Sequence, residues 1–187
     1  MCGLIGVVGP RAGQAAEWIK KGARLMAHRG PDDEGLIVAG GGKCVMAHRR
    51  LAIIDITPGG HQPMQDAGGE VSLVFNGEIY NFRELREQLR MEGVEFTSES
   101  DTEVLLQSYL AWSDECVKRL QGMFAFALYD NRREKLLMAR DRAGEKPLYY
   151  RHDGGSLVFS SEIKAMLGEP EFYPRISAGS LDHYLAF

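Results

Sequence analysis

Short apolar segments gather at both ends of this 187-residue chain, and two helical patterns lie together between them. A parallel α/β sheet would instead need strands that alternate with helices along the chain. The observed order predicts an α+β fold, in which antiparallel sheets are covered on the outside by helices. The expected strands are 2–8, 36–39, 44–47, 71–75, 123–129, 136–139, 147–150 and 157–159, and the expected helices are 15–27, 81–91, 100–112 and 161–167.

Two of the expected helices begin with a capping pattern. Asn81 and Ser100 each stand three residues before a glutamate, Glu84 and Glu103 respectively. In a capping box the first side chain accepts the amide hydrogen of the glutamate, and the glutamate side chain reaches back to the amide of the cap. We therefore expect Asn81 and Ser100 to cap their helices.

The composition disfavours several classes of function. The formal net charge is −4, whereas a nucleic-acid partner would need a basic surface. No run approaches the roughly 18 apolar residues of a membrane span. Gln14 and Glu17 interrupt any early signal-peptide pattern. We therefore expect a cytoplasmic protein whose partners include neither a nucleic acid nor a membrane.

The cysteines, histidines and glycines form no pattern typical of a metal or nucleotide site. Cys2, Cys44 and Cys116 make neither a CxxC pair nor a zinc spacing, and the five histidines are scattered. The pair Gly42-Lys43 lacks the upstream glycine and the following Ser or Thr of a phosphate-binding loop. We expect Cys44 and Cys116 to be ordinary packing residues, and we expect no metal or cofactor in this domain.

Cys2 is different because of its position. An initiator methionine is usually removed when the next residue is small, and removal of Met1 would leave an α-amine and a thiol on the same residue. An α-amine has a reference pKa of about 7.7–8.0, against about 10.4 for lysine, so much of it is unprotonated near neutral pH. Such an amine can draw the proton from its own thiol. Taken alone this signal is weak, because many chains begin Met-Cys by chance.

Other candidates are equally weak when taken singly. Asn76-Gly77 follows a strand and could supply two donors to an oxyanion, but Asn-Gly is also the commonest two-residue hairpin turn, which these residues alone favour. Arg50 could bind a carboxylate through two hydrogen bonds, and Asp101 at a helix start could receive an ammonium. For both, a structural charge is the simpler interpretation.

The order of several motifs along the chain is more informative than any one of them. After Cys2-Gly3-Leu4-Ile5-Gly6 come His28-Arg29-Gly30-Pro31-Asp32, His48-Arg49-Arg50-Leu51, Asn76-Gly77-Glu78-Ile79-Tyr80-Asn81, Ser100-Asp101-Thr102-Glu103, Arg140-Asp141-Arg142, Lys146-Pro147-Leu148-Tyr149-Tyr150 and Ser160-Ser161-Glu162-Ile163-Lys164. Over about residues 2–167 this closely resembles the N-terminal glutaminase domain of bacterial asparagine synthetases, which are class II, or N-terminal-nucleophile, glutamine amidotransferases.

The resemblance implies a fold and a set of roles. The fold would be a four-layer α/β/β/α sandwich of two antiparallel sheets, the N-terminal-nucleophile hydrolase fold. Cys2 would be the nucleophile, with its amine as base, and Asn76 and Gly77 would hold the oxyanion. The substrate L-glutamine would be bound by Arg50 at its carboxylate and by Asp101 at its ammonium. The same pocket would be lined by Leu51, Ile53, Ile54 and Glu78.

The resemblance also implies a larger enzyme. Residues 1–187 would form the type 2 glutamine amidotransferase domain, with a linker starting at about residue 168. A synthetase domain would follow Phe187, binding ATP and magnesium and using the ammonia to amidate aspartate or another carboxylate. A homodimer is left open. Ala143 departs from the larger apolar residue that many members of this family carry there.

An alternative function stays open at this point. A chain that kept Met1 would have its free amine on the wrong residue, and it would suit a catalytically silent module that senses glutamine.

Overall fold

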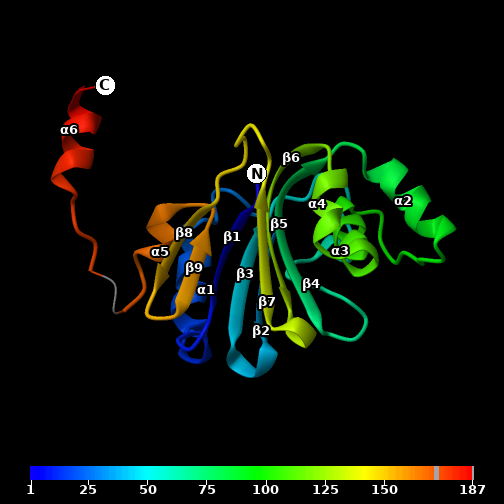
Figure 1. The fold of residues 1–187 in the computed structure, drawn as a ribbon, viewed down its shortest axis with the longest axis horizontal. Coiled ribbons are helices and arrows are strands. Elements are labelled where there is room, and N and C mark those ends of the chain that lie inside the picture. The colour runs from blue at the N-terminus through cyan, green and yellow to red at the C-terminus, as the bar shows by residue number, and fades with distance from the viewer. Residues whose placement is uncertain (171–172, 187) are drawn as a thin grey trace.

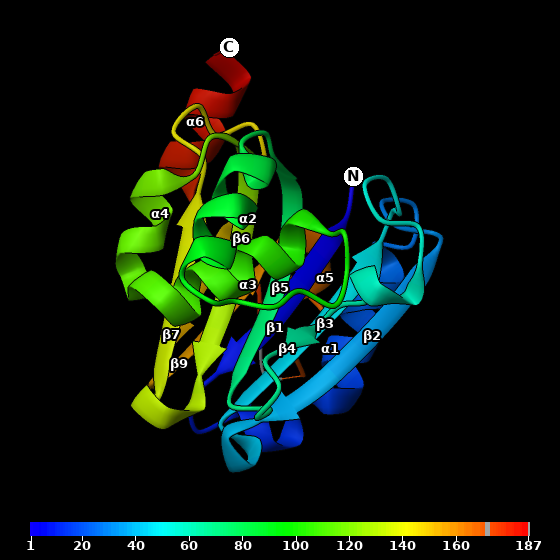
Figure 2. The ribbon, with the colours of Figure 1, turned by 90° about the vertical axis from the view of Figure 1, so that its right-hand side faces the viewer.

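The protein is built in four layers, with two antiparallel sheets face to face between two sets of helices (Figures 1 and 2). The computed structural model describes residues 1–170 and 173–186. The first sheet has the order β2 (Asp33–Ala39), β3 (Cys44–Arg50), β1 (Gly3–Val8), β9 (Ser156–Ser160), β8 (Tyr149–Asp153), and the second has the order β4 (Met64–Gln65), β5 (Val71–Ile79), β6 (Gly122–Asp130), β7 (Lys135–Arg140). This arrangement confirms the predicted α/β/β/α sandwich.

The helices cover the outer faces of the two sheets (Figure 1). The first sheet is covered by α1 (Ala16–Leu25) and α5 (Ile163–Met166), and the second by α2 (Phe82–Met91), α3 (Asp101–Trp112) and α4 (Cys116–Arg119). A further helix, α6 (Ala178–Ala186), lies away from the layers, and all its described side chains are exposed. No helix in the described part of the chain is long and apolar enough to cross a bilayer.

Alternation along the strands builds three separate cores. In β1, Leu4 packs between the two sheets, whereas Ile5 and Val7 pack against α1, as the two-residue period of a strand requires. Gly6 also faces the inter-sheet layer. A Cβ atom there would lie 2.4 Å from the ring of Phe159, so glycine is needed for the close approach. The N-terminal strand is thereby fixed at the centre of the first sheet, and Cys2, which directly precedes it, is held at its start.

The turn interpretation of Asn76-Gly77 is wrong. β5 continues through both residues to Ile79, because Asn76 pairs with Ala125 and Gly77 with Phe124 of β6. The close pairing also explains the glycine, since a Cβ on Gly77 would lie 2.2 Å from the carbonyl oxygen of Met123. Long-range pairing with β6 therefore overrides a local turn signal.

The remaining expectations were met to differing degrees. The strand expected at 147–150 is displaced to Tyr149–Asp153, and the helix expected at 161–167 is only Ile163–Met166. The short strand β4 and the helices α4 and α6 were not predicted. The linker expected from about residue 168 remains a prediction.

One of the two predicted helix caps is confirmed. The Ser100 hydroxyl accepts the Glu103 amide hydrogen at 3.2 Å, but the Glu103 carboxylate binds Thr97 and Ser98 instead of reaching back to Ser100. The expected Asn81 cap is wrong. Its side chain accepts from the Gln121 amide at 3.0 Å and donates to the Arg119 carbonyl at 2.9 Å, which fastens the start of α2 to the turn before β6.

Candidate active site

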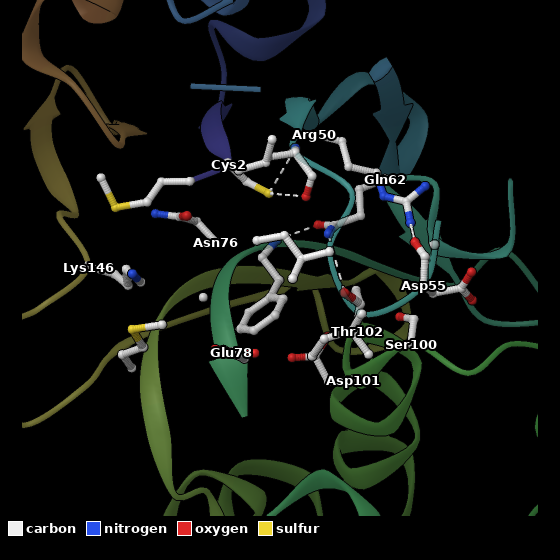
Figure 3. Close-up of a pocket in the computed structure, with 18 residues that line it drawn as sticks. Cys2, Arg50, Asp55, Gln62, Asn76, Glu78, Ser100, Asp101, Thr102 and Lys146 are labelled. Atoms are coloured by element: carbon white, nitrogen blue, oxygen red, sulfur yellow. Dashed lines mark hydrogen bonds between the residues drawn. The ribbon is translucent and has the colours of Figure 1, made fainter. Parts of the chain in front are cut away.

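A pocket opens beside Cys2, where the ends of β1 and β3, the edge of β5 and the start of α3 meet (Figure 3). Its cavity volume is about 130 Å³. All nine residues predicted for the site line this pocket: Cys2, Arg50, Leu51, Ile53, Ile54, Asn76, Gly77, Glu78 and Asp101. The fold therefore brings together residues that stand up to 99 positions apart in the sequence.

The Cys2 thiol is partly buried and lies against Leu51. The Leu51 amide donates to Sγ at 3.4 Å, and the Leu51 carbonyl lies 3.7 Å from the same sulfur. Arg29 fixes the backbone of the residue by donating from Nε to the Cys2 carbonyl at 2.8 Å. Burial raises the pKa of the Cys2 thiol, although the Leu51 amide and the charge of the chain terminus act in the opposite direction. A thiol in this setting needs a base to become a nucleophile.

The free edge of β5 presents one open amide to the pocket. In β5 the even-numbered residues turn their amides towards β6, and the odd-numbered ones turn theirs away from it. The Phe75 amide donates to the Gln62 side chain at 2.7 Å, and the Ile79 amide donates to Asp101 Oδ2 at 3.0 Å. Gly77 lies between these two positions, and its amide finds no acceptor in the part of the chain that the structure describes.

The Asn76 side chain is a second open donor. It is 1% exposed, and neither Nδ2 nor Oδ1 has a hydrogen-bond partner among the described residues. An unsatisfied buried polar group typically destabilises a fold by about 1–3 kcal/mol. The side chain lines the pocket to one side of Cys2 (Figure 3). Its amide is therefore available to a ligand, together with the backbone amide of Gly77.

Arg50 supplies the positive charge on the other side of Cys2 (Figure 3). Its Nη1 donates to the Thr57 carbonyl at 2.9 Å, and its Nη2 donates to the Asp55 carbonyl. These contacts orient the guanidinium without neutralising it, because it makes no ion pair within residues 1–170 and 173–186. Gly60 gives it room, since a Cβ there would lie 2.0 Å from Nη2.

Two carboxylates face the same pocket at its lower wall in Figure 3. Asp101 is 5% exposed, and burial raises its pKa to about 6, with the Glu78 charge adding to the rise and the Ile79 amide opposing it. Arg50 and these two carboxylates stand at separate walls of a pocket that Asp55 and Lys146 also line, and this separation of charge suits a zwitterionic ligand.

Replacing Asp101 by Asn should stabilise the fold at neutral pH. The folded pKa of about 6 lies above the value of 3.8 for a free aspartate, so native stability falls as the pH rises through this interval. Removing the charge should recover about 2–3 kcal/mol above pH 7 and nothing at pH 4. Thermal unfolding of both proteins at pH 4 and at pH 8 measures this gain in stability. Glu95→Gln, at an exposed position that makes no ion pair with the described residues, is the control. An equal change in Tm at pH 4 and pH 8 would contradict the burial of this charge.

The sequence analysis missed several residues that line the pocket. Gln62 and Lys146 are both largely buried there, and Thr102 lies beside Asp101. Lys146 belongs to a motif used for the resemblance, so that motif could have indicated it. Gln62 follows no strand or helix pattern, and no local signal singles it out. No cluster suited to a metal ion occurs in the described portion of the chain.

Comparisons with known proteins give a family match and several relatives. The family described as "Glutamine amidotransferase domain" matches residues 1–187. The chain is 42% identical over 185 residues to asparagine synthetase [glutamine-hydrolyzing] 3 of Bacillus subtilis, covering 97% of this chain and 30% of that protein. It is 40% identical over 202 residues to a putative asparagine synthetase [glutamine-hydrolyzing] of Mycobacterium tuberculosis, covering 98% of this chain and 31% of that protein.

The fold has a counterpart among solved structures. Glutamine phosphoribosylpyrophosphate amidotransferase from B. subtilis superposes with a TM-score of 0.75 at 23% identity, over 88% of this chain and 43% of that one. At this identity the likeness concerns the fold alone. The chain spans about 30% of the length of the curated relatives it matches.

Proposed function

This chain belongs to the glutamine amidotransferase domain family, and we propose that it hydrolyses L-glutamine to L-glutamate and ammonia through a thioester on Cys2. The observation that carries the proposal is the meeting of a sulfur nucleophile with two unpaired donors, Asn76 Nδ2 and the Gly77 amide, in one pocket. Acyl transfer requires a nucleophile beside two hydrogen-bond donors that are free to bind the oxyanion.

The substrate is held by its charged end. Arg50 binds the α-carboxylate with the donors that its loop contacts leave available. Asp101, assisted by Glu78, binds the α-ammonium, and that positive charge favours the ionised form of Asp101 in the complex. The side-chain amide of glutamine then points towards Cys2, with its carbonyl oxygen at Asn76 and Gly77.

The first half of the reaction forms the thioester. Removal of Met1 gives Cys2 a terminal amine, which takes the thiol proton as the sulfur attacks the amide carbon. Asn76 Nδ2 and the Gly77 amide donate to the oxygen as it becomes negative. The intermediate collapses, the carbon–nitrogen bond breaks, and the proton held by the amine passes to the departing nitrogen to give ammonia.

The second half returns the enzyme to its starting state. The same amine takes a proton from a water molecule that attacks the thioester carbon, and the two donors again hold the oxyanion. The carbon–sulfur bond breaks, the proton returns to the Cys2 sulfur, and glutamate leaves. One water is consumed for each glutamine, which balances the products glutamate and ammonia.

We further propose that the chain is part of a longer synthetase. Its relatives named asparagine synthetase are about three times as long, which supports a following domain that binds ATP and magnesium and consumes the ammonia. The acceptor, aspartate or another carboxylate, would be chosen in that domain.

A second candidate is a silent form that binds glutamine. Met1 lines the pocket, with its sulfur 3.9 Å from Arg29 Nη2. A chain that retained Met1 would bury the Cys2 nitrogen in a peptide bond and leave the thiol without its base.

Product analysis tests the proposal. The chain should convert L-glutamine to glutamate and ammonia in equal amounts, and it should act far more slowly on an analogue that lacks the α-ammonium, because Asp101 would then have no partner. Absence of glutamate release, or equal rates with the analogue, would refute the proposed reaction or the proposed orientation.

A further inference from the structure

We propose that Gln62 is a positioning residue for this reaction, because its side chain ties the strand that carries the oxyanion donors to the helix that carries the ammonium-binding carboxylate. The inference rests on the proposed function and adds a residue that lies outside every motif quoted for the resemblance. Figure 3 shows Gln62 between the strand that bears Asn76 and the start of α3, with dashed lines to both.

The contacts fix both ends of the Gln62 amide. Its Oε1 accepts the Phe75 amide hydrogen at 2.7 Å, and its Nε2 donates to the Thr102 hydroxyl at 3.3 Å. The residue is 4% exposed, so water does not compete freely for these bonds. The orientation of the amide is set by its partners, because the N–H of Phe75 can only donate.

The Phe75 contact bears directly on the oxyanion donors. β4 pairs only with Ser72 and Leu73, so no strand of the described residues lies beside β5 beyond Leu73. Gln62 takes the place of that strand at Phe75, and Asp101 takes it at Ile79. Only Gly77 between them is left open. Without Gln62, two amides in a row would be open, and a substrate carbonyl could bind at the wrong one.

A second contact, from the opposite sheet, holds the next peptide group along β5. His48 Nε2 donates to the Phe75 carbonyl at 2.9 Å, while Gln62 accepts from the Phe75 amide. The two peptide groups that flank Phe75, the second of which leads into Asn76, are thus each held by a buried side chain. Preorganised donors lower an activation barrier only when they stay aimed at the place where charge develops.

The Thr102 contact bears on substrate orientation. Thr102 follows Asp101 at the first turn of α3, so the Gln62–Thr102 bond, together with the direct Ile79–Asp101 bond, helps to hold this carboxylate against β5. A shift of about 1 Å in such a distance can lower a rate about 100-fold, because the reacting amide no longer meets both sulfur and donors. Gln62 therefore acts on both parts of the site through other residues.

The test compares Gln62→Met, Gln62→Glu and the control Gln65→Met. Gln62→Met keeps the size but removes both hydrogen bonds, whereas Gln62→Glu keeps the acceptor for Phe75. Gln65 donates only to Gly69 and Ser72, away from the pocket. For each protein kcat and KM for glutamine are measured, together with Tm and two rates of Cys2 labelling, one by iodoacetamide and one by an electrophilic glutamine analogue.

We expect kcat of Gln62→Met to fall roughly 10- to 100-fold, with a rise in KM. Gln62→Glu should recover at least a fifth of the wild-type kcat, and Gln65→Met should match wild type. Iodoacetamide labelling should stay the same in all four proteins, while labelling by the glutamine analogue should slow in Gln62→Met. This difference between the two labelling rates distinguishes a misplaced substrate from a disrupted pocket, because a disrupted pocket would alter both rates.

Wild-type kcat and KM for Gln62→Met, or an equal change in both labelling rates, would overturn the role of Gln62. If Gln62→Met does not fold, Thr102→Val removes one of the two contacts and should raise KM at least threefold, and an unchanged KM would overturn the role equally. Failure of the wild-type chain to release glutamate would refute the proposed function itself, and it is measured first.

Discussion

Replacing Cys2 by Ala should reduce glutamate release by roughly 10⁴-fold or more, because the reaction loses its nucleophile and no thioester can form. The other two cysteines cannot replace it. Cys44 and Cys116 are fully buried, and burial raises the pKa of each thiol to about 12. Initial rates at saturating glutamine, with mass spectrometry for a γ-glutamyl adduct, measure the effect.

Cys44→Ala is the matched control. It removes a thiol from the layer between the sheets and should lower Tm while leaving kcat near that of wild type. Full activity in Cys2→Ala, or loss of the adduct in Cys44→Ala with an unchanged Tm, would contradict the assignment of the nucleophile.

Replacing Asn76 by Ala should lower kcat by about 10²–10³-fold with little change in KM. The Asn76 amide binds charge that is present only as the tetrahedral intermediate forms, so the ground-state complex loses little. The stability of Asn76→Ala, unlike its kcat, should not fall. Both polar atoms of this buried side chain lack partners among the described residues, so their removal should leave Tm unchanged or raise it.

Asn131→Ala provides the comparison, because Asn131 donates to Glu70 at 2.8 Å at the far end of β5 and β6. It should lose some stability and keep its activity. A marked fall in Tm for Asn76→Ala would indicate that this asparagine has a structural role, and it would contradict the oxyanion role.

Local sequence patterns predicted the features that depend on neighbouring residues. The Ser100 cap and the apolar strand at the N-terminus are set within a few residues, and both were confirmed. The extension of β5 through Asn76-Gly77 could not be predicted in this way, because it depends on pairing with β6 about 50 residues later. The Asn81 side chain likewise binds residues of a distant turn.

The site was predictable only through the resemblance to a family. Taken alone, Arg50 and Asp101 read as ordinary structural charges, and only the fold reveals that both are buried at one pocket. Gln62 could not be predicted, because its role depends on hydrogen bonds to Phe75 and Thr102, which lie 13 and 40 positions away in the sequence. An isolated glutamine carries no sign of such a bridge.

The central claim is that the base belongs to the same residue as the sulfur, and a change of the chain start tests it directly. Insertion of a lysine between Met1 and Cys2 changes no lining residue of the pocket other than Met1, and it prevents exposure of the Cys2 nitrogen. Intact mass confirms the start of each protein, and glutamate release is then compared. We expect the wild-type chain to lack one methionine and to be active, whereas the extended chain should retain its start and run at less than about a hundredth of that rate. Equal turnover by the two proteins would contradict it.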